Sequence, residues 1–322
     1  MNKILALSGG LFCMVILVSC SKPADDAVVI QPGQVSVEAV VEESGPAEAF
    51  NALTGRYTGF EDITDLVQLQ NGRWEGAPWV EGTAARPQVI LLDGVDATGD
   101  LNGDGAAESV VLLNLAMGGT GQLLYLAVIP VDADSHSLIP VTLVGDRVRV
   151  REINISNGRL LLDVLQAGPQ DAMCCPGELA TRAWELNEAG VMMEIESGIE
   201  SQRLSVATLL GSEWVLDRWS RDEVAENTDI SLAFVDNGIA GSSGCNRYNA
   251  SITDGEAPGE VSIGPAAGTR MACPEKQMAV ESRFLQALSK VNKLSFLKRQ
   301  LLLTSASEAG ITSLYFDPKG VD

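Results

Sequence analysis

Residues 100–108 form the segment of this chain whose side chains are best suited to bind a metal ion. The Ala106 carbonyl can add an oxygen ligand, and Gly105 permits the sharp turn that brings such groups around one cation. Because calcium takes many oxygen ligands, the segment predicts a calcium site. The segment reads D-L-N-G-D-G-A-A-E, with oxygen-bearing side chains at its first, third, fifth and ninth positions, Asp100, Asn102, Asp104 and Glu108.

The same segment has a second interpretation as a polar turn between two strands. Val111 stands at the twelfth position, where a calcium-binding EF-hand carries a bidentate Glu. Asp and Asn side chains also stabilise turns by accepting hydrogen bonds from nearby backbone N–H groups. A calcium loop and a turn that holds itself together are therefore both open at this point.

Cysteine is the second residue type that could carry chemistry. An even number of cysteines favours disulfides over free thiols if the chain is exported, and zinc is disfavoured because His136 is the single histidine. Adjacent Cys174 and Cys175 can form a strained, redox-active disulfide, stay as thiols, pair elsewhere or shape a tight loop, and we prefer the structural interpretation. The four cysteines beyond residue 20 are Cys174, Cys175, Cys245 and Cys273.

Groups for other chemistry are sparse. His136 lies in the polar stretch D-A-D-S-H-S, which predicts a solvated side chain, and no G-x-S-x-G motif marks a nucleophile. We therefore predict that the chain is not an enzyme, with a hydrolase that uses two carboxylates as the alternative. The formal net charge of −21 argues against a nucleic acid as partner.

These residues are positioned by two regions that are rich in predicted strands. In the first, residues 50–200, Arg147, Arg149 and Arg151 alternate with valines and are predicted to face solvent. A weak helical pattern is confined to residues 62–69, so we predict an antiparallel β domain. Its strands are expected at 87–92, 109–115, 123–130, 146–155, 159–166 after an Asn157-Gly158 hairpin turn, and 181–186.

The second region, residues 206–320, is predicted to contain strands and one helix. Pro274 suits the first turn of that helix. Its apolar face is expected to carry Met278, Phe284, Leu285, Leu288 and Val291. Strands are expected at 213–219, 230–235, 239–240, 248–253, 260–263, 300–304 and 312–316.

Three motifs in this second region resemble those of a known family. They are G-S-E-W-V-L-D-R-W at 211–219, G-S-S-G-C-N-R-Y-N at 241–249 and G-T-R-M-A-C-P-E at 268–275. The region resembles the META domain family of HslJ-like proteins, which implies a small barrel-like fold. The resemblance also implies a disulfide between Cys245 and Cys273 and a structural role for Asn246. The family is linked only loosely to stress and antibiotic tolerance.

The first region resembles a recurrent, uncharacterised domain of bacterial envelope proteins. The motifs that carry this resemblance are G-D-L-N-G-D-G at 99–105, G-G-T-G at 118–121, G-D-R-V at 145–148 and C-C-P at 174–176. It implies a folded domain and no particular activity.

Residues 1–20 have the pattern of a bacterial lipoprotein signal peptide. An apolar stretch ends in L-V-S-C at 17–20, which resembles a lipobox with cleavage before Cys20 and lipid attached to it. Ser21, in a position where Asp retains lipoproteins in the inner membrane, predicts the outer membrane. Residues 21–49 are acidic and lack aromatic side chains, so they are predicted to be a flexible tether.

The sequence thus predicts a mainly β chain with two antiparallel β-rich domains, of which the second is small, barrel-like and has one helix. We expect a lipid-anchored protein of the outer membrane that faces the periplasm. Its expected role is non-catalytic: binding of an envelope protein or glycan, or structural support. An inhibitor or chaperone of periplasmic proteins is a further alternative, for which an exposed apolar patch is expected.

Overall fold

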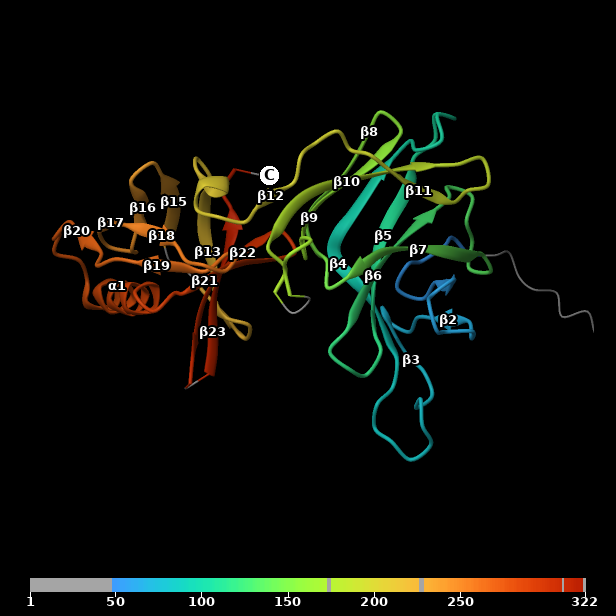
Figure 1. Cartoon of the computed structure of the whole chain (residues 1–322), viewed down its shortest axis with the longest axis horizontal. Helices are drawn as coiled ribbons and strands as arrows, with labels where there is room; N and C mark the ends of the chain where they lie inside the picture. Colours follow the sequence, from blue (N-terminus) through green and yellow to red (C-terminus); the bar gives the residue numbers. More distant parts are fainter. Residues whose placement is uncertain (1–47, 173–174, 226–228, 309, 321–322) are drawn as a thin grey trace, which may run out of the picture. The chain divides into compact units, whose positions relative to one another are not determined.

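A computed structural model describes residues 48–172, 175–225, 229–308 and 310–320 (Figure 1). All of these residues belong to one compact unit, Pro46–Asp322. Within the described ranges, no helix has the length and apolarity needed to cross a membrane. The fold is mainly β, as predicted, and nearly all of its strand pairs are antiparallel; the exception is the parallel pair of β1 (Arg56–Thr58) and β7 (Leu138–Asp146).

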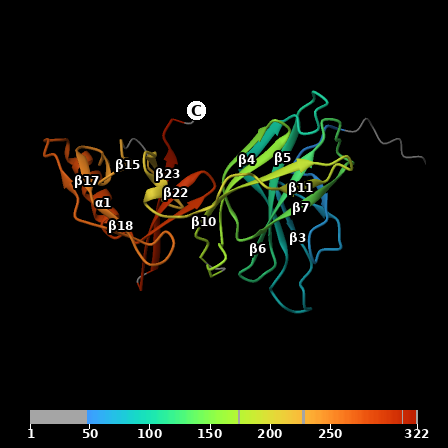
Figure 2. The same ribbon diagram turned by 45° about the horizontal axis from the view of Figure 1, so that its top comes forward.

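The first sheet has seven strands in the spatial order β2-β1-β7-β6-β5-β4-β3. Strands β4, β5 and β6 run side by side in it (Figure 2). Alternate residues of β5 face two separate cores, with Val110 and Leu112 in one and Val111 and Leu113 in the other. This double burial explains the unbroken apolar run of the strand. The remaining strands are β2 (Val67–Gln68), β3 (Arg73–Glu75), β4 (Gln88–Gly99), β5 (Glu108–Ala116) and β6 (Gln122–Ile129).

A second sheet covers one face of the first. Leu160, Leu162 and Trp184 of this sheet share a buried cluster with Val110 and Leu112, so the two sheets pack face to face. The predicted hairpin turn at Asn157 and Gly158 is confirmed, with positive φ at both residues, as a type I′ turn requires. The sheet comprises β8 (Arg149–Ser156), β9 (Arg159–Gln166), β10 (Glu178–Leu186), β11 (Met192–Ile195) and β12 (Gln202–Arg203).

The third sheet is barrel-like and, as predicted, is accompanied by one α-helix. Its strands follow the order β20-β17-β16-β15-β13-β23-β22-β21, with β14 paired to β13. Strands β18 and β19 form a separate hairpin, and a short 3₁₀ helix, η1 (Ala207–Leu209), precedes the sheet. The strands are β13 (Glu213–Ser220), β14 (Glu223–Val224), β15 (Ser231–Val235), β16 (Gly238–Ser242), β17 (Arg247–Ala250), β18 (Ile252–Asp254), β19 (Val261–Ile263), β20 (Ala267–Gly268), β21 (Lys293–Leu297), β22 (Gln300–Ser307) and β23 (Gly310–Pro318).

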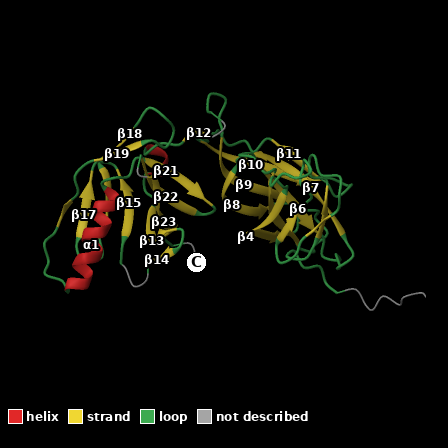
Figure 3. Cartoon of the chain, turned by 90° about the horizontal axis from the view of Figure 1, so that it is seen from below, coloured by secondary structure: helices red, strands yellow, loops and turns green. Residues whose placement is uncertain are grey.

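Helix α1 (Glu275–Leu288), the long red helix in Figure 3, begins directly after Pro274. Phe284 and Leu288 are fully buried in the core of the third sheet, as their spacing predicts. Met278 is 45 % exposed, and Val291 is buried but lies beyond the last helical residue. The predicted apolar face is therefore right near the C-terminus of the helix and wrong at Met278, because the first turn of α1 is exposed and contact with the core begins at Val280.

Three local predictions are wrong. Residues 62–69 form turns and the short strand β2 rather than a helix. The predicted strand at 248–253 is two strands, since β17 and β18 belong to different sheets. Arg149 and Arg151 are half-buried rather than solvent-facing: β8 packs against β21, where Arg149 donates a hydrogen bond to Ser295. Strand β21 was not predicted, so the surface that covers these arginines could not be anticipated.

Candidate functional site

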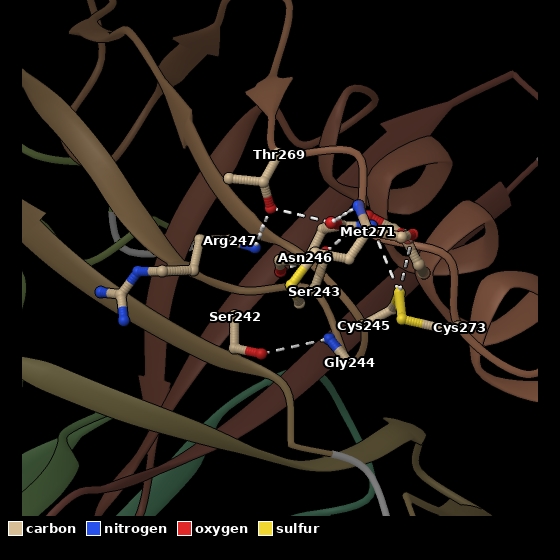
Figure 4. Close-up of a disulfide and its surroundings, with 10 residues drawn as sticks. Ser242, Ser243, Gly244, Cys245, Asn246, Arg247, Thr269, Met271 and Cys273 are labelled. Carbon is tan, nitrogen blue, oxygen red and sulfur yellow. Dashed lines mark hydrogen bonds between the residues drawn. A yellow bond between two sulfur atoms is a disulfide. The ribbon is translucent and has the colours of Figure 1, made fainter.

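The turn between β16 and β17 contains the best-connected polar group of the described chain (Figure 4). A side chain at Gly241 would clash with the Ser231 carbonyl of the neighbouring strand, and Gly244 adopts a φ of +99°, which favours glycine. These two requirements explain the glycines of the G-S-S-G motif. They let the chain turn tightly and place Cys245 and Asn246 beside residues 269–273.

Both polar atoms of the Asn246 carboxamide, Oδ1 and Nδ2, form hydrogen bonds. Its Oδ1 accepts hydrogen bonds from Thr269 Oγ1 at 2.8 Å and from the Met271 N–H at 2.7 Å. Its Nδ2 donates to Glu281 Oε2 at 3.1 Å and lies 3.2 Å from Cys245 Sγ. Because the side chain is only 6 % exposed, these partners replace water almost completely.

Ser243 links the same turn to helix α1. Its buried hydroxyl lies 2.7 Å from the Asn246 carbonyl and 2.9 Å from Glu281 Oε1, and one hydroxyl hydrogen is shared between these two acceptors. Glu281 therefore receives hydrogen bonds from two residues of the turn. Figure 4 shows Arg247 extending away from this group, which leaves its guanidinium outside the network.

A disulfide joins Cys245 and Cys273, whose Cα atoms are 6.1 Å apart and whose positions differ by 28 residues. The structure thus contains the pair that the family resemblance implies. Cys273 precedes Pro274, the residue that caps α1, so the bond ties the glycine turn to the start of the helix. We call Ser243, Cys245, Asn246, Thr269, Met271, Cys273 and Glu281 the Asn246 cluster.

The predicted calcium loop lies between β4 and β5 and is closed by its own hydrogen bonds. Asp100 accepts hydrogen bonds from the Gly103 and Gly105 N–H groups at 2.6 and 3.0 Å. Asn102 and Asp104 accept from the N–H groups two residues further on. These are the contacts of a self-supporting polar turn.

Glu108 completes this loop from the first residue of β5. Its buried carboxylate accepts the Leu101 N–H at 2.8 Å and Asn102 Nδ2 at 3.2 Å. Among the described residues, no three Asp, Glu, His or Cys side chains are grouped as a metal site requires. Calcium at Asp100, Asn102, Asp104, the Ala106 carbonyl and Glu108 stays a prediction, because loops of this kind can also bind calcium through the same oxygens.

Two of the singled-out cysteines cannot be placed. Cys20 and Cys174 lie outside the described residues, so the lipid at Cys20 and the state of the Cys174–Cys175 pair stay predictions. Cys175 is half-buried at the start of a described segment. His136 is exposed in the turn after β6, as the polar stretch around it predicts.

A cavity of about 460 Å³ is the feature that the sequence interpretation missed. Four basic side chains line it: Arg147, Arg149, Arg221 and Lys298. Its apolar lining includes Leu124, Val148, Val150, Phe296 and Leu302. The alternating Arg and Val residues at 147–151 were the visible signal, but a solvent-facing strand gives the same pattern. We call this cavity the basic pocket.

Two arginines of β8 are half-buried: Arg149 lines the basic pocket, and Arg151 lies two residues further along the strand. Burial lowers the pKa of Arg149, and Cys175 opposes this effect. Burial also lowers the pKa of Arg151, which nearby Asp163 and Glu152 oppose. The Arg151 guanidinium lies 4.5 Å from the centre of the Phe296 ring, and its buried Nε has no hydrogen-bond partner among the described residues.

Comparison with known proteins gives a match for the C-terminal third. Residues 207–316 match the model of the META domain. A solved structure, the NMR structure of a protein from Burkholderia xenovorans, is 26 % identical over 41 % of this chain and 100 % of that chain, with a TM-score of 0.30. No curated protein matches the chain.

Proposed function

We propose that this chain, whose residues 207–316 form a META domain, is a lipoprotein of the bacterial outer membrane that acts by binding or structural support rather than by catalysis. The observation that carries the proposal is the L-V-S-C segment at 17–20, which follows an apolar stretch. Lipid on Cys20 would anchor the folded unit to the membrane surface. The acidic segment 21–49 would act as its tether.

The disulfide of the Asn246 cluster supports export. Disulfides persist in the periplasm and are rare in the bacterial cytosol, where thiols are kept reduced. Cys245 and Cys273 lie close enough to pair without distortion of the backbone. The fold is therefore suited to an oxidising compartment, in agreement with the lipoprotein signal.

Lipid attachment is tested by metabolic labelling with radioactive palmitate in a Gram-negative host. The wild-type chain should incorporate label, and Cys20→Ser should abolish incorporation and leave an unprocessed precursor. Cys13→Ser is the matched control, because it removes another cysteine of the same segment and should leave labelling intact. Labelling of Cys20→Ser, or its absence in the wild-type chain, would contradict the proposal.

The predicted location in the outer membrane is tested by separating inner and outer membranes on a sucrose gradient. The wild-type lipoprotein should sediment with the outer membrane. Ser21→Asp should move it to the inner membrane, since Asp after the lipidated cysteine acts as the retention signal. A wild-type protein found in the inner membrane would contradict the outer-membrane assignment while leaving lipidation itself intact.

A further inference from the structure

The basic pocket carries a charge opposite to that of the chain around it. The whole sequence has 43 acidic and 22 basic residues. Among the described residues that line the pocket there are four basic side chains and no Asp or Glu. Arg147 is already paired with Asp146, so Arg149, Arg221 and Lys298 supply the excess positive charge. A positive pocket on an acidic protein concentrates anions locally.

Arg149, which lines the pocket, and its neighbour Arg151 are half-buried cations. The charges near them are Cys175 for Arg149, and Asp163 and Glu152 for Arg151. Among the described side chains, neither Arg149 nor Arg151 forms an ion pair with a carboxylate. Arg149 contacts the neutral Ser295 hydroxyl, and Arg151 Nε is buried without an acceptor. Partial burial of the Arg149 charge without a direct ion pair to a carboxylate costs free energy, and an anion bound in the pocket would offset that cost.

The rest of the lining is apolar. Val148, which precedes β8, lines the pocket together with Val150 of β8 and Leu124 of β6, and Phe296 and Leu302 line it from β21 and β22. A small inorganic anion would leave this surface uncovered, and a purely apolar ligand would leave the guanidinium groups unpaired. The pocket volume of about 460 Å³ is in the range of natural small-molecule sites.

We infer that the basic pocket binds a single-chain amphiphile with an anionic head, either a carboxylate or a phosphate. The head pairs with Arg149 and Arg221, and the alkyl chain lies against Val148, Val150 and Phe296. Both head chemistries suit guanidinium groups, because each presents several oxygens to the N–H fork. This inference does not depend on lipidation of Cys20, since the pocket belongs to the compact unit Pro46–Asp322.

Binding is tested on a soluble form of the protein, residues 21–322, which is exported without the lipidated cysteine. Each amphiphile is titrated into it in a calorimeter, below the critical micelle concentration of that amphiphile. Dodecanoate and dodecyl phosphate are the two anionic probes. Dodecyltrimethylammonium and dodecyl maltoside carry the same chain on a cationic and a neutral head, and inorganic phosphate is a head without a chain. At least one anionic probe should bind, and the three control ligands should bind at least tenfold more weakly or not at all.

Charge-removing variants connect the binding to the pocket. Arg149→Gln and Arg221→Gln should each weaken binding of the anionic probe about tenfold, the effect of losing one charge-assisted hydrogen bond. Arg221 is exposed, so its replacement tests the site even if Arg149→Gln disturbs folding. Arg159→Gln is the matched control: Arg159 lies on the neighbouring strand β9, pairs with Glu185 and should not affect binding.

Each pattern of binding either supports or overturns the inference. Binding of dodecanoate alone points to a free fatty acid, and binding of dodecyl phosphate alone points to a phospholipid-like ligand; both support the inference. Equal binding of dodecyl maltoside would show an apolar pocket without head recognition. Equal binding of inorganic phosphate would show an anion site without chain recognition. Either result, or no binding of both anionic probes, overturns the inference and leaves the lipoprotein proposal standing.

Discussion

The Asn246 cluster and the loop at residues 100–108 are both polar networks built on glycine turns. They differ in how far apart in the sequence their hydrogen-bonded residues lie. In the loop, the hydrogen bonds join residues no more than seven positions apart. In the Asn246 cluster, the bonds from the turn to Thr269 and Glu281 span 23 and 35 residues. One network shapes a local turn, whereas the other joins a strand, a loop and a helix.

The two networks also differ in the burial of their side chains. Ser243 and Asn246 are buried, whereas Asn102 and Asp104 are exposed. A buried polar group that loses its partner costs free energy, because water cannot replace the hydrogen bond. An exposed group loses little. Stability of the fold should therefore depend strongly on the Asn246 cluster and weakly on the exposed side chains of the loop.

Removal of the disulfide should have the largest effect. The two cysteines are 28 positions apart, and closing a loop of that length stabilises the folded chain by about 3 to 4 kcal/mol. Replacing both cysteines with Ser should lower the free energy of unfolding by this amount. Each single variant should lose about as much as the double variant, because either one breaks the same bond. Urea unfolding measures this, and losses that simply add would show that the cysteines act independently.

Asn246→Ala should be the next most damaging change. It leaves the Met271 N–H and the Glu281 carboxylate without their buried partner, which predicts a loss of about 2 to 3 kcal/mol. Asn249→Ala is the matched control, since Asn249 is exposed on β17, the strand that follows Asn246, and its replacement should cost far less. Equal losses in the two variants would contradict the structural role of the cluster.

Asp104→Ala tests the loop, where the expected effect is smaller and depends on the ion. Without calcium, the variant should unfold close to the wild-type chain, because Asp104 is exposed. With calcium, only the wild-type chain should gain melting temperature, by linkage between binding and folding. Asp132→Ala, a change at another exposed acidic residue, should keep the full gain. If calcium raises no melting temperature in any of them, the loop is a polar turn alone.

Glu223→Gln should have the smallest effect, and one that depends on pH. A hydrogen bond from Arg283 lowers the pKa of Glu223 below its ordinary value of 4.5 in the folded state. The resulting stabilisation is present above pH 4.5 and is lost as the pH falls through the lower folded-state pKa. Both side chains are half exposed, so the contribution is small.

Urea midpoints at about pH 7 and about pH 3 measure this effect. The wild-type chain should be slightly more stable than Glu223→Gln at the higher pH, and the difference should shrink at the lower one. Arg283 lies 4.3 Å from the centre of the Trp219 ring in the wild-type chain, and this contact should persist in the variant, so the comparison isolates the ion pair. A difference that does not change with pH would contradict the assigned pKa shift.

The sequence predicts local features of this fold well and long-range ones only through family resemblance. The turn at Asn157-Gly158 and the buried strands β5 and β6 follow from residue types a few positions apart. Strand β7 was not predicted; it contains Pro140 and Gly145, residues that rarely occur inside strands. The basic pocket was missed because it depends on contact between β8 and β21, which no local pattern of Arg and Val can reveal.

The disulfide of the Asn246 cluster is the most direct test of the account, because it unites the META domain, the long-range network and export. Trypsin should release residues 222–247 and 271–276 from the chain exported by its own N-terminal segment, and these peptides contain Cys245 and Cys273. Mass spectrometry under non-reducing conditions should find the two peptides linked, and reduction should separate them. Free thiols in both peptides of the exported protein would contradict the account.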